Sequence, residues 1–176
     1  MIIDVHAHAY PSQDIKELLT ALERYEINRI YISNPNTPGG YYPSEDQVSE
    51  QNRITLGIVK QCPEKFRYVP FVNPVYDSSV DIIKRAIEDN DAKAIKLWVA
   101  TTCDSPHVDK IAELSIKYNV PILIHAFHKH VGLLPDESTG FHVANLAKRY
   151  PESKLIMAHM GGNAYHGIKY VKGLPN

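Results

Sequence analysis

The chain has 176 residues, which is enough for one domain of ordinary size or for part of a larger one. Its apolar fraction of 44% and charged fraction of 22% are typical of a globular protein with a buried core and exclude a disordered tail. The formal net charge of −1 gives no electrostatic reason to expect nucleic acid or anionic lipid as a partner.

The sequence also argues against secretion and membrane insertion. Apolar runs fall well short of the ~20 residues that a membrane helix needs, and the N-terminal residues lack the pattern of a secretory signal. Two cysteines, Cys62 and Cys103, are too few for a disulfide framework. We therefore expect a cytoplasmic protein with neither a membrane nor a nucleic acid as its partner.

Short β-rich runs alternate with amphipathic stretches along the whole chain. Strands are predicted at residues 2–9, 29–33, 67–72, 94–99, 121–125 and 154–160. Helices are predicted at residues 12–25, 44–61, 79–89, 107–118, 141–150 and 164–171, and residues 34–40 are too rich in Pro and Gly for regular structure. Six βα units in this order predict an α/β fold, with a parallel sheet covered by helices in a single domain over residues 1–176.

Two parallel architectures compete for this pattern. A doubly wound nucleotide-binding sheet places a Gly-rich phosphate loop after its first strand. Here the chain has no glycine before Gly39, and the P-loop pattern is also absent. A β/α barrel of the TIM type, with about six of its eight βα units, is the architecture that fits.

Histidine is the unusual residue in the composition, with nine copies. Asp4, His6 and His8 alternate along the first strand and therefore point to the same side of it. If that side faces a barrel axis, both imidazoles reach the C-terminal mouth, where barrel active sites are built. The same spacing also fits ordinary polar positions of a strand.

Two further histidines, His125 and His159, close the apolar strands at 121–125 and 154–160. Either the four histidines share one ion at the mouth, or each caps its own strand through a backbone hydrogen bond. Imidazole suits zinc, iron, nickel or manganese, and zinc is the usual choice for hydrolytic chemistry without redox. We therefore expect one divalent metal ion, zinc in the first place.

These motifs carry a resemblance to a known family. Asp-Val-His-Ala-His at 4–8, Pro-Ile-Leu-Ile-His-Ala at 121–126 and Ile-Met-Ala-His-Met-Gly-Gly at 156–162 resemble the amidohydrolase superfamily. Within it they are most similar to the branch of amidohydrolase-related (amidohydrolase 2) TIM-barrel hydrolases and aminocarboxymuconate-semialdehyde-type decarboxylases. The resemblance extends along essentially the whole chain.

The resemblance implies a role for each of the four histidines. His6, His8 and His125 would bind one divalent metal, and His159 would be the catalytic residue that contacts water or substrate. The family site is completed by an aspartate at the end of an eighth strand, and no such residue follows His159 here. We therefore expect the sequence to be part of a longer barrel, or a chain whose open side is covered by another copy in a homo-oligomer.

Each of the other residues near the predicted mouth has two possible roles. Lys96, in the fourth strand, would be either a metal-bridging lysine, as in bimetallic members of the superfamily, or a buried cation paired with Asp4 or another carboxylate. Trp98 would line a substrate pocket or serve only in packing. His128 and His130, after the fifth strand, would meet the substrate or lie in a solvated loop.

Three functions follow from this assignment. The first is a metal-dependent hydrolase in which metal-activated water attacks the carbonyl of a small carboxylate-bearing amide, lactone or ester. The second is non-oxidative decarboxylation of an aromatic or enoic acid on the same metal. The third is an inactive metal-binding fragment of such an enzyme.

Overall fold

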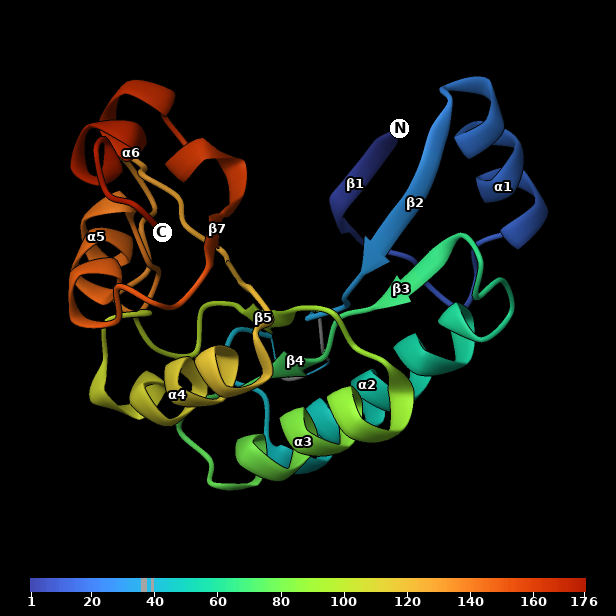
Figure 1. Ribbon diagram of the computed structural model, residues 1–176, viewed down its shortest axis with the longest axis horizontal. Helices are drawn as coiled ribbons and strands as arrows, with labels where there is room; N and C mark the ends of the chain where they lie inside the picture. The colour runs from blue at the N-terminus through green and yellow to red at the C-terminus, as the bar shows by residue number, and fades with distance from the viewer. Residues whose placement is uncertain (36–37, 39) are drawn as a thin grey trace.

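The computed structural model describes residues 1–35, 38 and 40–176, and it folds them into a curved parallel sheet with helices along its outer side (Figure 1). The segment predicted to be irregular, residues 34–40, therefore lies partly outside the described residues. Among the described residues, no helix is both long and apolar enough to cross a lipid bilayer.

Strands and helices alternate as the sequence predicts. The strands are β1 (Ile2–Ala7), β2 (Ile27–Ile32), β3 (Phe66–Tyr68), β4 (Phe71–Val72), β5 (Ile95–Leu97), β6 (Ile122–Ile124) and β7 (Leu155–Met157). The α-helices are α1 (Ile15–Arg24), α2 (Glu45–Val59), α3 (Ser78–Asn90), α4 (Asp109–Tyr118), α5 (Gly140–Arg149) and α6 (Ala164–Val171). Two short 3-10 helices, η1 (Pro106–Val108) and η2 (Ala158–Gly161), precede α4 and α6.

The strand predicted at residues 67–72 is divided in two by a change of neighbour. The Val69 amide donates to the Ile32 carbonyl on one side, and the Pro70 carbonyl accepts from the Lys96 amide on the other. Three strands in the order β1-β2-β3 and four in the order β4-β5-β6-β7 therefore follow one another along the curve, all parallel. This succession of parallel neighbours, with helices outside, is a partial β/α barrel.

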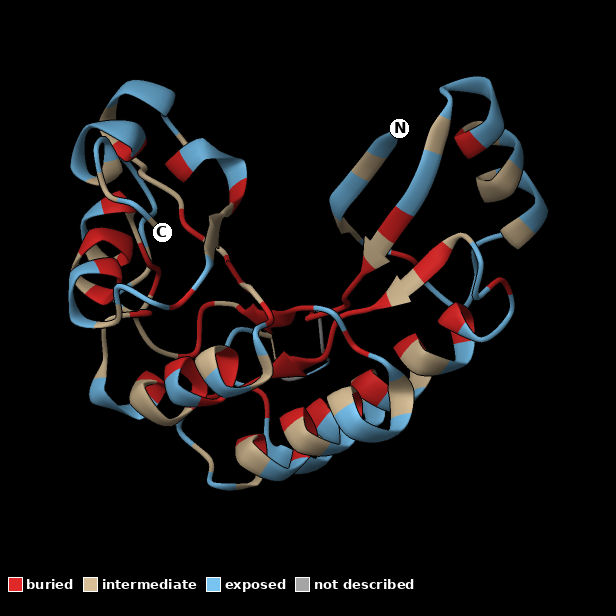
Figure 2. Ribbon diagram, in the orientation of Figure 1, coloured by how far each residue is buried: buried red, intermediate tan, exposed pale blue. Residues whose placement is uncertain are grey.

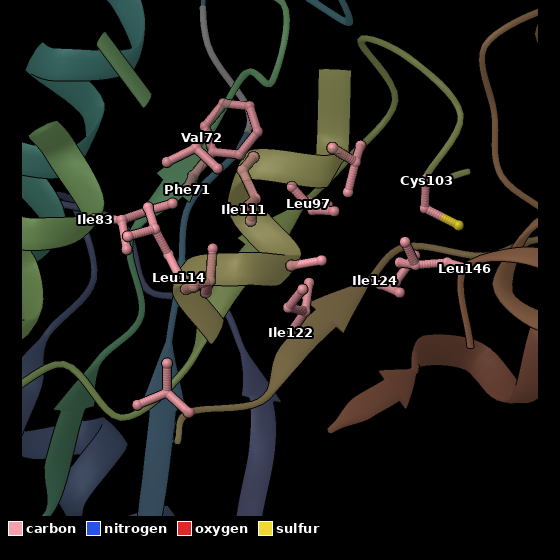
Figure 3. Close-up of a cluster of buried hydrophobic side chains, with 14 of the residues drawn as sticks. Phe71, Val72, Ile83, Leu97, Cys103, Ile111, Leu114, Ile122, Ile124 and Leu146 are labelled. Atoms are coloured by element: carbon pink, nitrogen blue, oxygen red, sulfur yellow. The ribbon is translucent and has the colours of Figure 1, made fainter. Parts of the chain in front are cut away.

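The larger core lies between β4–β7 and the helices α3, α4 and α5. Figure 3 shows its apolar side chains, among them Phe71, Ile83, Ile111, Ile122 and Leu146. Figure 2 shows the same distribution over the whole fold, with the short central strands buried and β1 largely exposed. Burial on both faces explains why β5 and β6 read as uninterrupted apolar runs, apart from one lysine.

Several predicted strands, β1 and β7 among them, are longer than the structure has them. β1 ends at Ala7, two residues before the predicted end, and its pairing with β2 is irregular between Asp4 and Ala7. β7 ends at Met157 because His159 and Met160 take left-handed backbone conformations, with φ of 57° and 50°, and turn the chain into η2. His159 therefore lies beyond the strand rather than at its last residues.

Glycines bring α5, η2 and α6 into backbone contact. A Cβ built on Gly161 would lie 2.5 Å from the Cα of Gly167, and one built on Gly167 would overlap the Met160 carbonyl. Gly140, at the start of α5, is equally close to Gly167. These contacts dock the last helix against the segment that carries His159.

Gly167→Ala should therefore destabilise the fold by about 3 kcal/mol or more, because backbone atoms have to separate to admit the methyl group. Gly57→Ala is the matched control, since it lies in the exposed interior of α2 with nothing within 4 Å of its built Cβ. That substitution should stabilise the chain by about 1 kcal/mol through helix propensity. Urea unfolding of both variants measures the difference, and equal stabilities would contradict the packing described.

Candidate metal centre

The carboxyl ends of the strands bring one group of side chains to a single cavity. His6 lies in β1 and His8 follows it, Lys96 lies in β5, His125 follows β6, and His159 lies in η2. All five line a cavity of about 260 Å³, together with Tyr10, Pro35 and Trp98. The convergence expected from the sequence is therefore present, at the end of the partial barrel where parallel strands deliver their functional residues.

The four imidazoles form a row of neighbours. Ring centroids are 5.1 Å apart for His8 and His6, 4.9 Å for His6 and His159, and 4.9 Å for His159 and His125. All three pairs meet edge to face. The ligand atoms of His6, His8 and His125 do not all lie within 4.8 Å of one another, so binding one ion requires small rotations of these side chains.

Hydrogen bonds outside the cavity fix which ring nitrogens of His8 and His125 are free. The Nδ1 of His8 donates to the carbonyl oxygen of Ser33, which leaves its Nε2 without a proton. The Nε2 of His125 donates to Glu137 Oε1 at 2.9 Å, which leaves its Nδ1 as an acceptor, 3.2 Å from His159 Nε2. A carbonyl or carboxylate behind each ring is the usual support of a metal-binding histidine.

Glu137 is the residue of this site that the sequence did not reveal. It is only 2% exposed, and both of its carboxylate oxygens contact Lys129 Nζ, at 2.7 and 2.8 Å. In the sequence it is one of several polar residues between the fifth predicted strand and the next helix. No local pattern distinguishes it, because its burial comes from the packing of that segment against His125.

Lys96 is buried, as one of its two interpretations predicted, but the carboxylate partner expected for it is wrong. Its side chain is 1% exposed, and Nζ lies 3.2 Å from His6 Nε2. In the described part of the chain no carboxylate forms an ion pair with it, and Asp4 is exposed and accepts from the His6 amide instead. Burial lowers the pKa of Lys96 from 10.5 to about 7.

Burial also keeps the four imidazoles neutral. It lowers the pKa of His6 from 6.5 to about 3, with the charge of Lys96 as the next cause. The pKa values of His8, His125 and His159 are lowered as well, first by burial. Neutral imidazole is the form that binds a metal ion, so the donor set fits a divalent cation in protonation and in outer hydrogen bonds.

The remaining predicted residues divide between the cavity and its surroundings. Trp98 lines the cavity and also packs against Phe71 and Tyr41. His128 and His130 do not line this cavity, because the chain after Phe127 turns them toward α6. Contact with a substrate, one of the two roles expected for them, stays a prediction.

The pKa of Lys96 has a measurable consequence for stability. Between pH 7 and 10.5 the unfolded chain holds a proton on this amine that the folded chain has lost, so the free energy of unfolding should rise with pH across this window. Lys96→Met removes the buried charge and should stabilise the fold by up to about 4 kcal/mol at pH 7 and by little near pH 10.5.

Urea unfolding at a series of pH values measures this difference. Lys172→Met, at an exposed position, is the matched control and should follow the pH dependence of the unmodified chain. Parallel pH profiles for both variants and the unmodified chain would show that Lys96 is not desolvated in the folded state.

Comparison with known proteins gives matches at the level of structure alone. No family model matches the sequence, and no curated protein matches it. Structurally, the chain is similar to an amidohydrolase II, with a TM-score of 0.72 and 14% identity over 97% of this chain and 71% of that one. It is also similar to a dihydroxybenzoic acid decarboxylase from Polaromonas with bound manganese and the inhibitor 2-nitroresorcinol (TM-score 0.74, 14% identity, 97% and 67% covered).

A third similar structure is 4-oxalomesaconate hydratase from Rhodopseudomonas palustris (TM-score 0.67, 18% identity, 97% of this chain and 67% of that one). These proteins differ in reaction and share one architecture. The similarity to them covers both the curved sheet and the helices outside it. The chain therefore has the fold of the amidohydrolase-2 branch of the amidohydrolase superfamily, the family that its histidine motifs resemble.

Proposed function

We propose that this chain binds one divalent metal ion through His6, His8 and His125 and acts on a small aromatic carboxylic acid, which it decarboxylates without an oxidant. The observation that carries the proposal is the meeting of four neutral imidazoles and a buried amine in one cavity. Held by these residues, the metal would supply positive charge for the substrate carboxylate and for the negative charge that develops on the ring as carbon dioxide leaves.

The lining of the cavity supports a substrate of this kind. Lys96 lies on its floor, where an anionic group would favour the protonated amine. Tyr10 and Trp98 offer aromatic surfaces against which a flat ring can pack. Among the described lining residues there is no carboxylate to repel an acid.

Decarboxylation replaces a carbon–carbon bond with a carbon–hydrogen bond, so a proton has to reach the ring carbon as carbon dioxide leaves. His159 is the cavity imidazole outside the proposed ligand set, and its Nε2 carries a proton toward His125 Nδ1. If His125 held the ion, this contact would be released and His159 Nε2 would be free to face the substrate. We assign His159 the positioning and transfer of that proton.

Hydrolysis of an amide, lactone or ester is the second candidate, favoured by the similarity to amidohydrolase II. In that reaction His159 would hold the attacking water or the developing oxyanion. Zinc is the metal expected for hydrolysis, whereas manganese is bound in the Polaromonas decarboxylase. Both ions are therefore needed in the experiments.

Removal of a proposed ligand should remove metal. His8→Ala should bind one equivalent less of zinc or manganese than the unmodified chain, whereas the exposed His107→Ala should lose none. Glu137→Gln should weaken binding by about 10- to 100-fold, because the carboxylate behind His125 orients the ring and raises its basicity. Exposed Glu152→Gln is its control. Elemental analysis after dialysis gives the metal content, and unchanged content in His8→Ala would contradict the ligand assignment.

The reaction is tested with the metal-loaded chain and 2,6-dihydroxybenzoate. We expect carbon dioxide and resorcinol as products, and a kcat for His159→Asn that is at least about 100-fold lower, as for loss of a proton-transfer group. Binding of 2-nitroresorcinol, followed by its absorbance, should depend on metal. Turnover of an amide or lactone panel without carbon dioxide release would favour hydrolysis, and metal binding with no turnover of either class would favour the inactive metal-binding form.

A further inference from the structure

A second group of histidines lies outside the candidate metal centre. His128 and His130 follow β6, and His166 lies in α6. Their ligand nitrogens all lie within 4.8 Å of one another, a closer grouping than that of His6, His8 and His125. No sequence pattern predicts this group, because His166 is expected to be an ordinary residue of a helix surface.

The chain after β6 sends alternate side chains in two directions. Phe127 packs against His125 and His159, and Lys129 reaches Glu137, so both face the candidate centre. His128 and His130 face the other way, toward His166. The two groups of imidazoles are therefore separate, although they share one stretch of backbone.

Backbone contacts hold the two segments of this second group together. The His128 amide donates to the Gly161 carbonyl at 2.7 Å, and Gly162, with φ of +85°, approaches so closely that a Cβ would lie 2.6 Å from His128 N. Gly167, next to His166, packs on Gly161. The backbones on both sides of the group are thus fixed before any ligand binds, which lowers the cost of ordering them.

The rings lie in an arrangement that small rotations can close around an ion. His128 and His166 stack with centroids 4.7 Å apart and planes 13° apart, and His130 stands at nearly a right angle to both, at 5.3 and 5.8 Å. Zinc–nitrogen bonds of about 2.0–2.1 Å place tetrahedral ligand nitrogens about 3.4 Å apart. Nitrogens that already lie within 4.8 Å of one another therefore have to approach by at most about 1.4 Å. His130 is exposed and His128 and His166 are half-buried, which leaves room for this movement.

Of the neighbouring positive charges, that of Lys129 is engaged elsewhere, in its ion pair with the buried Glu137. Lys169 lies 4.7 Å from the centroid of the Tyr170 ring, and its charge also acts on His166. Three imidazoles without a carboxylate or thiolate are a donor set for zinc, nickel or copper, since calcium and magnesium prefer oxygen.

From this geometry we propose that His128, His130 and His166 form a second metal site, for a divalent ion of the zinc, nickel and copper class. The ion joins the segment after β6 to α6, with solvent completing its coordination. The site does not rest on the proposed function, because it shares no ligand with the centre at His6, His8 and His125.

Zinc is the probe for the test. His130→Ala and His166→Ala should each retain one equivalent less of zinc after dialysis than the unmodified chain, with affinity at this site at least about tenfold weaker. His107→Ala is the matched control and should retain as much as the unmodified chain. The His8→Ala, His130→Ala double variant should retain one equivalent less of zinc than His8→Ala alone. This further loss separates the second site from the candidate centre.

Two further readouts exclude a purely structural effect of the substitutions. Zinc should raise the Tm of His8→Ala and leave that of the His8→Ala, His130→Ala double variant unchanged. Copper(II) bound to His8→Ala should show nitrogen couplings in its electron paramagnetic resonance spectrum that decrease in number in the double variant. Zinc content and Tm shifts that are the same with and without His130, in variants with unchanged circular dichroism, would overturn the proposal.

Discussion

The parallel hydrogen-bond ladder across β4, β5, β6 and β7 is the constraint on which the candidate centre depends. It sets Lys96 beside Leu123 and Leu123 beside Ile156, in unbroken register. Because these strands are short, the segment that follows each strand leaves the sheet at the same edge within a few residues. A slip of one residue in any pair would turn the inward side chains toward the helices, so this ladder, rather than any contact among the side chains, sets Lys96, His125 and His159 side by side. The pairing of β1 with β2 places His6 and His8 in the same way.

Desolvation gives the cavity its chemical character. It keeps the imidazoles neutral and brings the pKa of the Lys96 amine to about 7, so this group of nitrogen atoms carries little charge by itself. Such a cavity can accept a cation through free lone pairs and an anion through a proton gained by Lys96. Desolvation of Lys96 also destabilises the fold, because a buried amine without a carboxylate partner opposes folding until it loses its proton.

Much of this could be predicted from the sequence, and the failures have physical causes. The βα alternation and the four cavity histidines follow from hydrophobic periodicity and from the position of polar residues at strand ends. The division of the third predicted strand at Pro70 and the early end of β7 depend on neighbours that the local pattern does not contain. Glu137 and His166 gain their surroundings only from tertiary packing, so neither a motif nor a period distinguishes them.

The backbone of His159 limits what evolution can do at this position. A left-handed conformation at a residue with a full side chain costs about 1 kcal/mol or more, whereas asparagine and glycine tolerate it readily. By stability alone, asparagine or glycine would therefore be favoured over histidine at this position. A histidine at this position is thus a cost to stability that only the imidazole itself can offset.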